Sequence, residues 1–174
     1  MNAAAASADH GDVLLARCDE MLPQVYGYVV RRVRNRTDAE DLTAEAFMAA
    51  VTSIRRGQVD EVTPAWLIGI ARHKLADHWR KAEREQRRLT AVASSEPDDA
   101  GRAGAWDVEL DLQDARDVLE ALGPHHRAAL TLRYVDDLSV PAVAELLGRT
   151  VHATEALLVR ARSAFRVAYE EVRS

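Results

Sequence analysis

The sequence predicts an all-α protein made of two small helical domains joined by an acidic flexible linker. Aromatic residues make up only 5% of the chain, whereas the good helix formers Ala, Leu, Arg and Glu are abundant. Residues 139–166 have the pattern of two helices separated by a short break that contains glycine. Residues 94–107 (SSEPDDAGRAGAWD) lack helical periodicity and combine Ser, Pro, Gly and Asp, which is typical of a linker.

These observations predict four segments: a flexible tail over residues 1–11, a helical domain over 12–90, the linker over 91–109 and a second helical domain over 110–174. The formal net charge of −5 is concentrated in the middle of the chain, since residues 93–124 hold nine acidic and two basic side chains. The two domains themselves are close to charge balance. A basic face on either domain is therefore compatible with the acidic total.

Composition excludes several classes of protein. Hydrophobic residues make up 48% and charged residues 29%, as in an ordinary globular domain. No apolar run approaches the ~20 residues of a membrane span, and the start, MNAAAASADHGD, lacks the basic and apolar parts of a signal peptide. Cys18 is the only cysteine, which excludes an internal disulfide. We therefore expect a cytoplasmic protein without membrane insertion.

The N-terminal domain is expected to begin with two helices. Residues 12–34 favour helix, interrupted or restarted near Pro23. Thr37 and Glu40 have the spacing of a capping box for the next helix, which should reach about residue 54. The buried positions of that helix are Ala39, Leu42, Ala46, Ala50 and Ile54, whereas the exposed side gathers Asp38, Asp41 and Glu45. The acidic side is either a docking surface for a basic partner or a solvated face.

A third helix should follow the polar loop of residues 55–62. Thr63 and Pro64 form a strong start signal, a capping residue before proline at the first helical position, and the helix should reach the high 80s. Its inward positions are Leu67, Ile70, Ala71, Leu75 and Trp79, whereas His73, Asp77, Arg80 and Arg84 share an outer face flanked by Lys74, Lys81 and Arg88. Residues 72–88 hold seven basic and three acidic side chains. This face either contacts phosphates or is simply solvated.

The C-terminal domain carries the helix-turn-helix pattern. Ser139 caps a first helix that tolerates Pro141 in its first turn, Gly148 ends that helix, and Thr150 caps the second. The second helix buries a stripe formed by Thr154, Leu158, Ala161, Phe165 and Ala168. Off this stripe lie His152, Ala153, Ala156, Leu157 and Arg160, which could face a major groove. An ordinary helical hairpin is the alternative interpretation.

Signals of catalysis or metal binding are weak. His73 and Asp77 share a helix face without a third ligand, and His125–His126 lack a carboxylate three or four residues away. The sequence contains no phosphate-binding Gly-rich loop and no nucleophile elbow. We therefore expect a protein that is not an enzyme, with no catalytic residues, no metal and no cofactor.

Three blocks in order carry a resemblance to a known family: DAEDLTAEAF (38–47), PAWLIGIARHKLADHWRK (64–81) and LEALGPHHRAALTLRYVDDLSVPAVAELLG (119–148). Together they resemble an extracytoplasmic-function (ECF) sigma factor, the two-domain class of the bacterial sigma-70 family. The resemblance implies a sigma domain 2-like bundle that binds core RNA polymerase and melts the −10 element. It also implies a sigma domain 4-like helix-turn-helix that binds the −35 element, joined through an acidic linker that enters the polymerase cleft.

The resemblance also implies roles for particular residues. It implies that the clamp of core polymerase binds at Asp38, Asp41 and Glu45. It also aligns the loop 55–62 with the family's pocket for a flipped base. It implies contacts to the −10 element from Arg72, His73, Asp77, Arg80, Lys81 and Arg84, and to the −35 element from Arg149, His152, Ala153, Glu155, Ala156, Leu157 and Arg160. The implied partners are the β and β′ subunits of core polymerase and promoter DNA, with an anti-sigma factor as a further candidate.

The reading helix departs from the family at two positions. Glu155 and Leu157 stand where the family usually has Lys and Arg. Glutamate can accept a hydrogen bond from cytosine, and leucine can contact a thymine methyl group. Phosphate attraction would then depend on Arg149, Arg160, Arg162 and Arg166.

The alternative function for the whole chain is a helix-turn-helix regulator that binds DNA without polymerase.

Overall fold

The computed structural model describes the backbone of residues 3–90 and 111–173, and every regular element in these residues is helical. The predicted all-α class is therefore confirmed. The linker predicted over residues 91–109 lies outside the described residues. The chain divides into two compact units, Met1–Leu75 and Ala76–Ser174. This division falls inside one long helix and not in the predicted linker.

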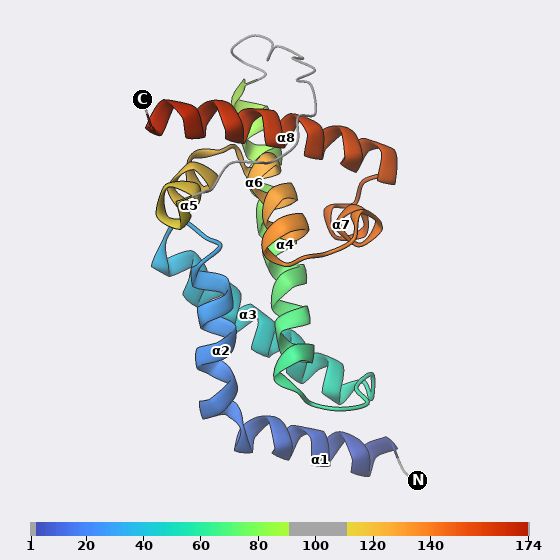
Figure 1. Ribbon diagram of the computed structural model, residues 1–174. Helices are drawn as coiled ribbons and strands as arrows, with labels where there is room; N and C mark the ends of the chain where they lie inside the picture. Colours follow the sequence, from blue (N-terminus) through green and yellow to red (C-terminus); the bar gives the residue numbers. More distant parts are fainter. Residues whose placement is uncertain (1–2, 91–110, 174) are drawn as a thin grey trace. The chain divides into compact units, whose positions relative to one another are not determined.

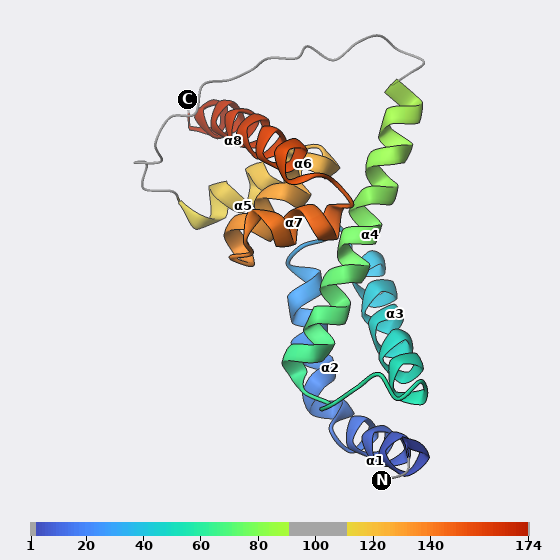
Figure 2. The ribbon, with the colours of Figure 1, turned by 90° about the vertical axis from the view of Figure 1, so that its right-hand side faces the viewer.

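The first unit contains α1 (Ala3–Ala16), α2 (Cys18–Val30), α3 (Arg36–Arg55) and the first half of α4 (Pro64–Thr90). Helices α2 and α3 lie side by side in both views, and α1 contacts each of them (Figures 1 and 2). The core is formed by apolar side chains at helical spacing: Met21, Val25, Val29, Ala39, Leu42, Ala46, Ala50, Ile54, Leu67, Ala71 and Leu75. The stripe expected for α3 is confirmed in full.

Three expectations for the N-terminal helices were wrong. The helix does not break at Pro23, which lies inside α2; the break is at Arg17. Helix α1 begins at Ala3, inside the expected tail, because its Ala-rich sequence favours helix. Helix α3 begins one residue before Thr37 and is capped by Asn35, whose side chain accepts a hydrogen bond from the Asp38 backbone N–H at 2.7 Å. The expected capping box is therefore displaced by an earlier cap.

The second unit contains the rest of α4, α5 (Leu112–Ala121), α6 (Pro124–Leu130), a π-helical turn (Thr131–Val135), α7 (Val140–Leu147) and α8 (Val151–Val172). Helix α8 packs against α5, α6 and α7, and Figure 1 shows these three helices beneath it. Because one helix touches three others, its rotation about its own axis is fixed along most of its length.

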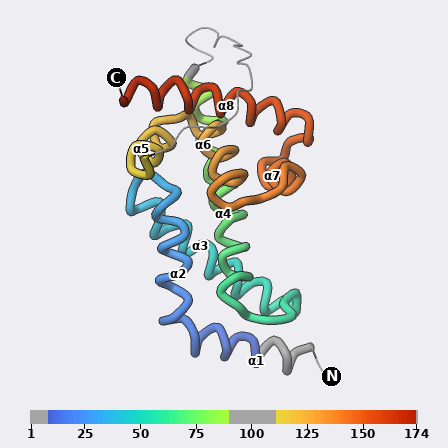
Figure 3. Tube along the Cα trace, viewed as in Figure 1, coloured from blue at the N-terminus to red at the C-terminus, as the bar shows by residue number. Residues whose placement is uncertain are grey.

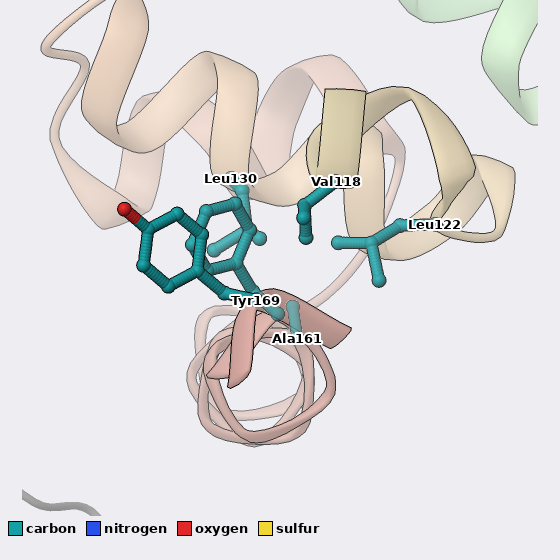
Figure 4. Close-up of a cluster of buried hydrophobic side chains, with 6 residues drawn as sticks. Val118, Leu122, Leu130, Ala161 and Tyr169 are labelled. Atoms are coloured by element: carbon teal, nitrogen blue, oxygen red, sulfur yellow. The ribbon is translucent and has the colours of Figure 1, made fainter. Parts of the chain in front are cut away.

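A cluster of buried side chains anchors the C-terminal half of α8. It consists of Val118, Leu122, Leu130, Ala161, Phe165 and Tyr169 (Figure 4). The ring of Tyr169 closes one side of the cluster, and its hydroxyl oxygen accepts a hydrogen bond from the backbone N–H of Asp111 at 2.8 Å. This anchoring determines which side chains at the other end of α8 remain exposed.

Candidate functional site

The helix-turn-helix is formed by α7, a three-residue turn and α8, as the capping pattern predicts. Ser139 and Thr150 accept capping hydrogen bonds from the backbone N–H groups of Ala142 and Ala153 at 3.5 and 3.1 Å. Gly148 adopts the left-handed conformation with φ of 63°, and the next N–H, that of Arg149, donates to the Ala144 carbonyl at 2.9 Å. Glycine adopts the left-handed conformation most readily, because it has no Cβ. The tight turn can be followed in the tube trace (Figure 3).

Helix α8 presents one polar side and buries the other. Its buried side chains are Thr154, Leu157, Leu158, Ala161, Phe165 and Tyr169. His152, Glu155 and Arg160 are exposed, and Ala153 and Ala156 are half-buried between them. The expected stripe is thus confirmed, except that Ala168 is only partly buried.

The predicted DNA contact by Leu157 is wrong. Its side chain is only 2% exposed and lies beside Ala128 of α6 and Leu147 of α7. Residues 154, 157 and 158 fall on neighbouring positions of a helix with 3.6 residues per turn, so packing α8 against both α6 and α7 widens the buried arc to include Leu157. The buried stripe expected from the sequence was too narrow, because it assumed that α8 packs against its neighbours along one row of residues.

The turn of the motif contacts the second half of α4 within the unit Ala76–Ser174. Arg149 donates a hydrogen bond to the Glu83 carboxylate, which also accepts one from Arg87 at 2.6 Å. At Gly148 a Cβ atom would lie 3.2 Å from a guanidinium nitrogen of Arg80. Arg149 is therefore half-buried and ion-paired within this unit.

The outer face of α4 is mixed in charge. His73, Asp77, Lys81 and Arg84 are exposed, whereas Arg72 and Arg80 are half-buried. Arg80 forms an ion pair with Asp77, one turn earlier. Of the predicted −10 contacts, Lys81 and Arg84 are thus the most accessible cations. The start predicted at Thr63 is confirmed, since the Thr63 hydroxyl accepts a hydrogen bond from the Trp66 N–H at 3.2 Å.

An open hollow of about 710 Å³ lies along α3 and contains two of the three acidic residues predicted to bind polymerase. Asp41 and Glu45 line it, whereas Asp38 does not and instead accepts a hydrogen bond from the Asn35 side chain. The remaining lining residues are Ala44, Met48, Ala49, Thr52, Ser53, Arg56 and Lys74.

Two residues of this hollow were missed from sequence. Met48 is 69% exposed and follows Glu45 by three residues. The Lys74 ammonium lies 3.6 Å from the Glu45 carboxylate. Helical spacing alone could have indicated Met48, since it continues the row of Asp41 and Glu45, whereas Lys74 comes from another helix.

His125 and His126, which were not expected to form a metal site, lie together in α6. The rings of His125 and His126 are 4.1 Å apart between centroids. Burial, with smaller effects from His125 and Arg160, lowers the pKa of His126 to about 4, so it is neutral near pH 7.

Within residues 3–90 and 111–173, no group of three or more His, Cys, Asp or Glu side chains could hold a metal ion. The described helices include none long and apolar enough to cross a membrane.

The capped motif of α7, its three-residue turn and α8 defines the class of helix-turn-helix DNA-binding proteins. Comparison with known proteins identifies the family. Residues 18–85 match the family model of sigma-70 region 2, and residues 112–165 match that of sigma-70 region 4. The chain therefore belongs to the sigma-70 family of bacterial sigma factors, and its relatives place it in the ECF group.

Two relatives show the extent of the similarity. The ECF RNA polymerase sigma factor BldN of Streptomyces coelicolor is 31% identical over 159 residues, which cover 90% of this chain but only 60% of BldN. The RNA polymerase sigma factor CarQ of Myxococcus xanthus is 36% identical over 129 residues, or 72% of this chain and 71% of CarQ.

A solved structure supports the same fold. The sigma factor RpoE from Bartonella quintana, determined in complex with the anti-sigma factor NepR, aligns with a TM-score of 0.54 at 23% identity. The alignment covers 93% of this chain and 97% of RpoE.

Proposed function

We propose that this chain directs core RNA polymerase to promoters and helps to open the DNA, through surfaces on α3, α4 and α8. The observation that carries the proposal is the exposed N-terminal half of α8 in a correctly capped helix-turn-helix. The first residues of such a second helix enter the major groove and contact base edges.

The hollow on α3 is proposed as the docking surface for core polymerase. Asp41 and Glu45 supply negative charge, and Met48 supplies an exposed apolar group between them and the end of the helix. Such a combination suits a basic, partly apolar helix surface, because apolar contact supplies affinity and charge supplies orientation. We assign this surface to the β′ side of the clamp, with the β subunit contacting the C-terminal domain.

Helix α4 is proposed to bind the −10 element. Lys81 and Arg84 are exposed and can contact phosphates, while His73 is exposed on the same outer face. DNA melting exposes unstacked bases, and their capture by protein offsets an unstacking cost of a few kcal/mol. The loop after α3 is the proposed place of capture, although Val59 and Val62 in it point into the core.

The −35 element is assigned to α8. The reading surface excludes the buried Leu157. It consists of His152, Ala153, Glu155, Ala156 and Arg160. Arg149 can join it once it leaves Glu83.

Sigma factors are non-enzymatic initiation factors, so we propose that the chain has no catalytic activity of its own. We also propose that it acts in the cytoplasm, where RNA polymerase works, and that an anti-sigma factor regulates it.

Reconstitution with core polymerase tests the proposal. The isolated protein should bind promoter duplex weakly, whereas the holoenzyme should bind it tightly and open it, as shown by permanganate reactivity of unpaired thymines near −10. The alternative, a regulator that works without polymerase, predicts the reverse: tight binding of a symmetric operator by the protein alone, and no co-purification with core polymerase.

A further inference from the structure

Glu155 is an exposed acid with no structural role in its own helix. Within the described residues it makes neither a hydrogen bond nor an ion pair. The neighbours at three and four residues are Val151, His152, Leu158 and Val159, so no Lys or Arg is in reach along the helix. Some exposed helical acids are paired, as Glu20 is with Arg17 and Glu40 with Arg36, whereas Glu171 on the same helix, like Glu155, has no such partner among the described residues.

Capping does not explain Glu155 either. The N-cap of α8 is Thr150, and a capping box would place the acid at position 153, where the chain has alanine. Position 155 lies beyond the first turn, where the favourable interaction of an acid with the helix dipole has largely decayed. An unpaired carboxylate on a DNA-facing surface also repels phosphates. Its presence is therefore unfavourable for binding to DNA in general.

The surroundings of Glu155 allow close approach to bases. Ala153 and Ala156 of the same reading surface are small, and the caps at Ser139 and Thr150 fix the direction of the helix start. The burial of Leu157 and Leu158 sets the rotation of α8, which leaves Glu155 on the open side. Glu155 and Leu157 are the two positions where α8 departs from the family. Because Leu157 is buried, Glu155 is the exposed one of the two.

We propose that Glu155 selects a cytosine in the −35 element, by accepting a hydrogen bond from the cytosine N4 amino group in the major groove. This inference rests on the proposed function of α8 as the −35 reader. In the major groove cytosine presents only a donor, whereas guanine and thymine present acceptors, and adenine presents a donor beside the acceptor N7. A carboxylate accepts but cannot donate, so the expected order of preference is cytosine, then adenine, then thymine and guanine.

The rejection of the wrong bases is as important as the attraction of the right one. Opposite guanine or thymine the carboxylate would lose water and face an oxygen or nitrogen lone pair, which is unfavourable. A well-made contact of this type discriminates by about 1–3 kcal/mol, or roughly 5- to 150-fold in affinity.

A promoter library with a randomised −35 element, transcribed by the reconstituted holoenzyme, tests the inference. Wild type should enrich cytosine at one −35 position by roughly 5- to 150-fold over guanine and thymine. Glu155→Gln should shift that position towards adenine, because glutamine pairs with adenine N6 and N7. Glu171→Gln is the matched control: it removes the same charge from an exposed position at the far end of α8, and it should retain the wild-type preference.

A duplex with one atom group deleted makes the test specific. When the preferred cytosine is replaced by 2-pyrimidinone, which lacks the 4-amino group, wild-type holoenzyme should lose affinity, whereas the Glu155→Ala holoenzyme should lose none. The inference is overturned if Glu155→Gln keeps the wild-type preference, or if both holoenzymes respond equally to the deleted amino group. If wild type forms no promoter-specific holoenzyme at all, the proposed function fails and the inference fails with it.

Discussion

Replacing Leu157 with alanine should destabilise the C-terminal unit without changing promoter choice. Leu157 is 2% exposed beside Ala128 and Leu147, so the substitution leaves a cavity at the corner where α7 meets α8. Buried Leu→Ala substitutions cost about 2–5 kcal/mol through lost transfer energy and the cavity. With a urea slope of about 1–3 kcal/mol per M, the unfolding midpoint should fall by on the order of 1–2 M.

The assay is urea unfolding followed by circular dichroism, with Val167→Ala as the control. Val167 lies on the same helix but is 55% exposed, so its replacement should change stability by less than about 0.5 kcal/mol. Holoenzyme with Leu157→Ala should also retain the wild-type −35 preference below its unfolding temperature. Unchanged stability with an altered −35 preference would show that Leu157 faces the groove, and would refute the placement of α8 described above.

Three further predictions concern docking, DNA binding and pH. Reversing the charge of Asp41 and Glu45 to Lys should weaken binding to core polymerase by roughly tenfold or more without loss of helicity, as measured by fluorescence anisotropy. Arg84→Ala should lower holoenzyme affinity across promoters and reduce the salt slope by about 0.9 for one duplex phosphate contact. The pKa of His126 is lowered from 6.5 to about 4, so stability should fall as pH drops from 6.5 towards 4, and His126→Gln should flatten this dependence.

Matched controls separate these outcomes from general effects of charge. Glu61→Lys changes an exposed acid outside the α3 hollow and should leave polymerase affinity unchanged. Arg31→Ala removes an exposed cation from the end of α2 and should leave the salt slope unchanged. Equal effects in control and test variants would indicate that net charge, and not these surfaces, governs binding. For His126, a wild-type stability that is constant between pH 6.5 and 4 would contradict the buried neutral ring.

Several signals for which one short segment contains all the atoms involved predicted the structure correctly, although the capping box at Thr37 was displaced by the earlier cap at Asn35. Ser139, Thr63 and Thr150 cap the helices they were expected to cap, because a cap joins a side chain to a backbone N–H two or three residues away. Gly148 ends α7 because glycine, which has no Cβ, adopts the left-handed conformation most readily. The buried stripe of α3 follows from helical periodicity and one dominant packing direction. These elements depend on neighbours in sequence, which a sequence displays directly.

Contacts between distant segments were decided by packing alone. Leu157 is buried because α8 meets α6 and α7 at the same corner, and nothing near residue 157 in the chain indicates the second neighbour. The pairing of Arg149 with Glu83 joins residues 66 positions apart, and the approach of Lys74 to Glu45 joins two helices. Periodicity states which side of a helix is apolar but not how wide an arc its neighbours cover. The exposed set at each proposed surface therefore depends on how many helices pack there, which only the folded arrangement determines.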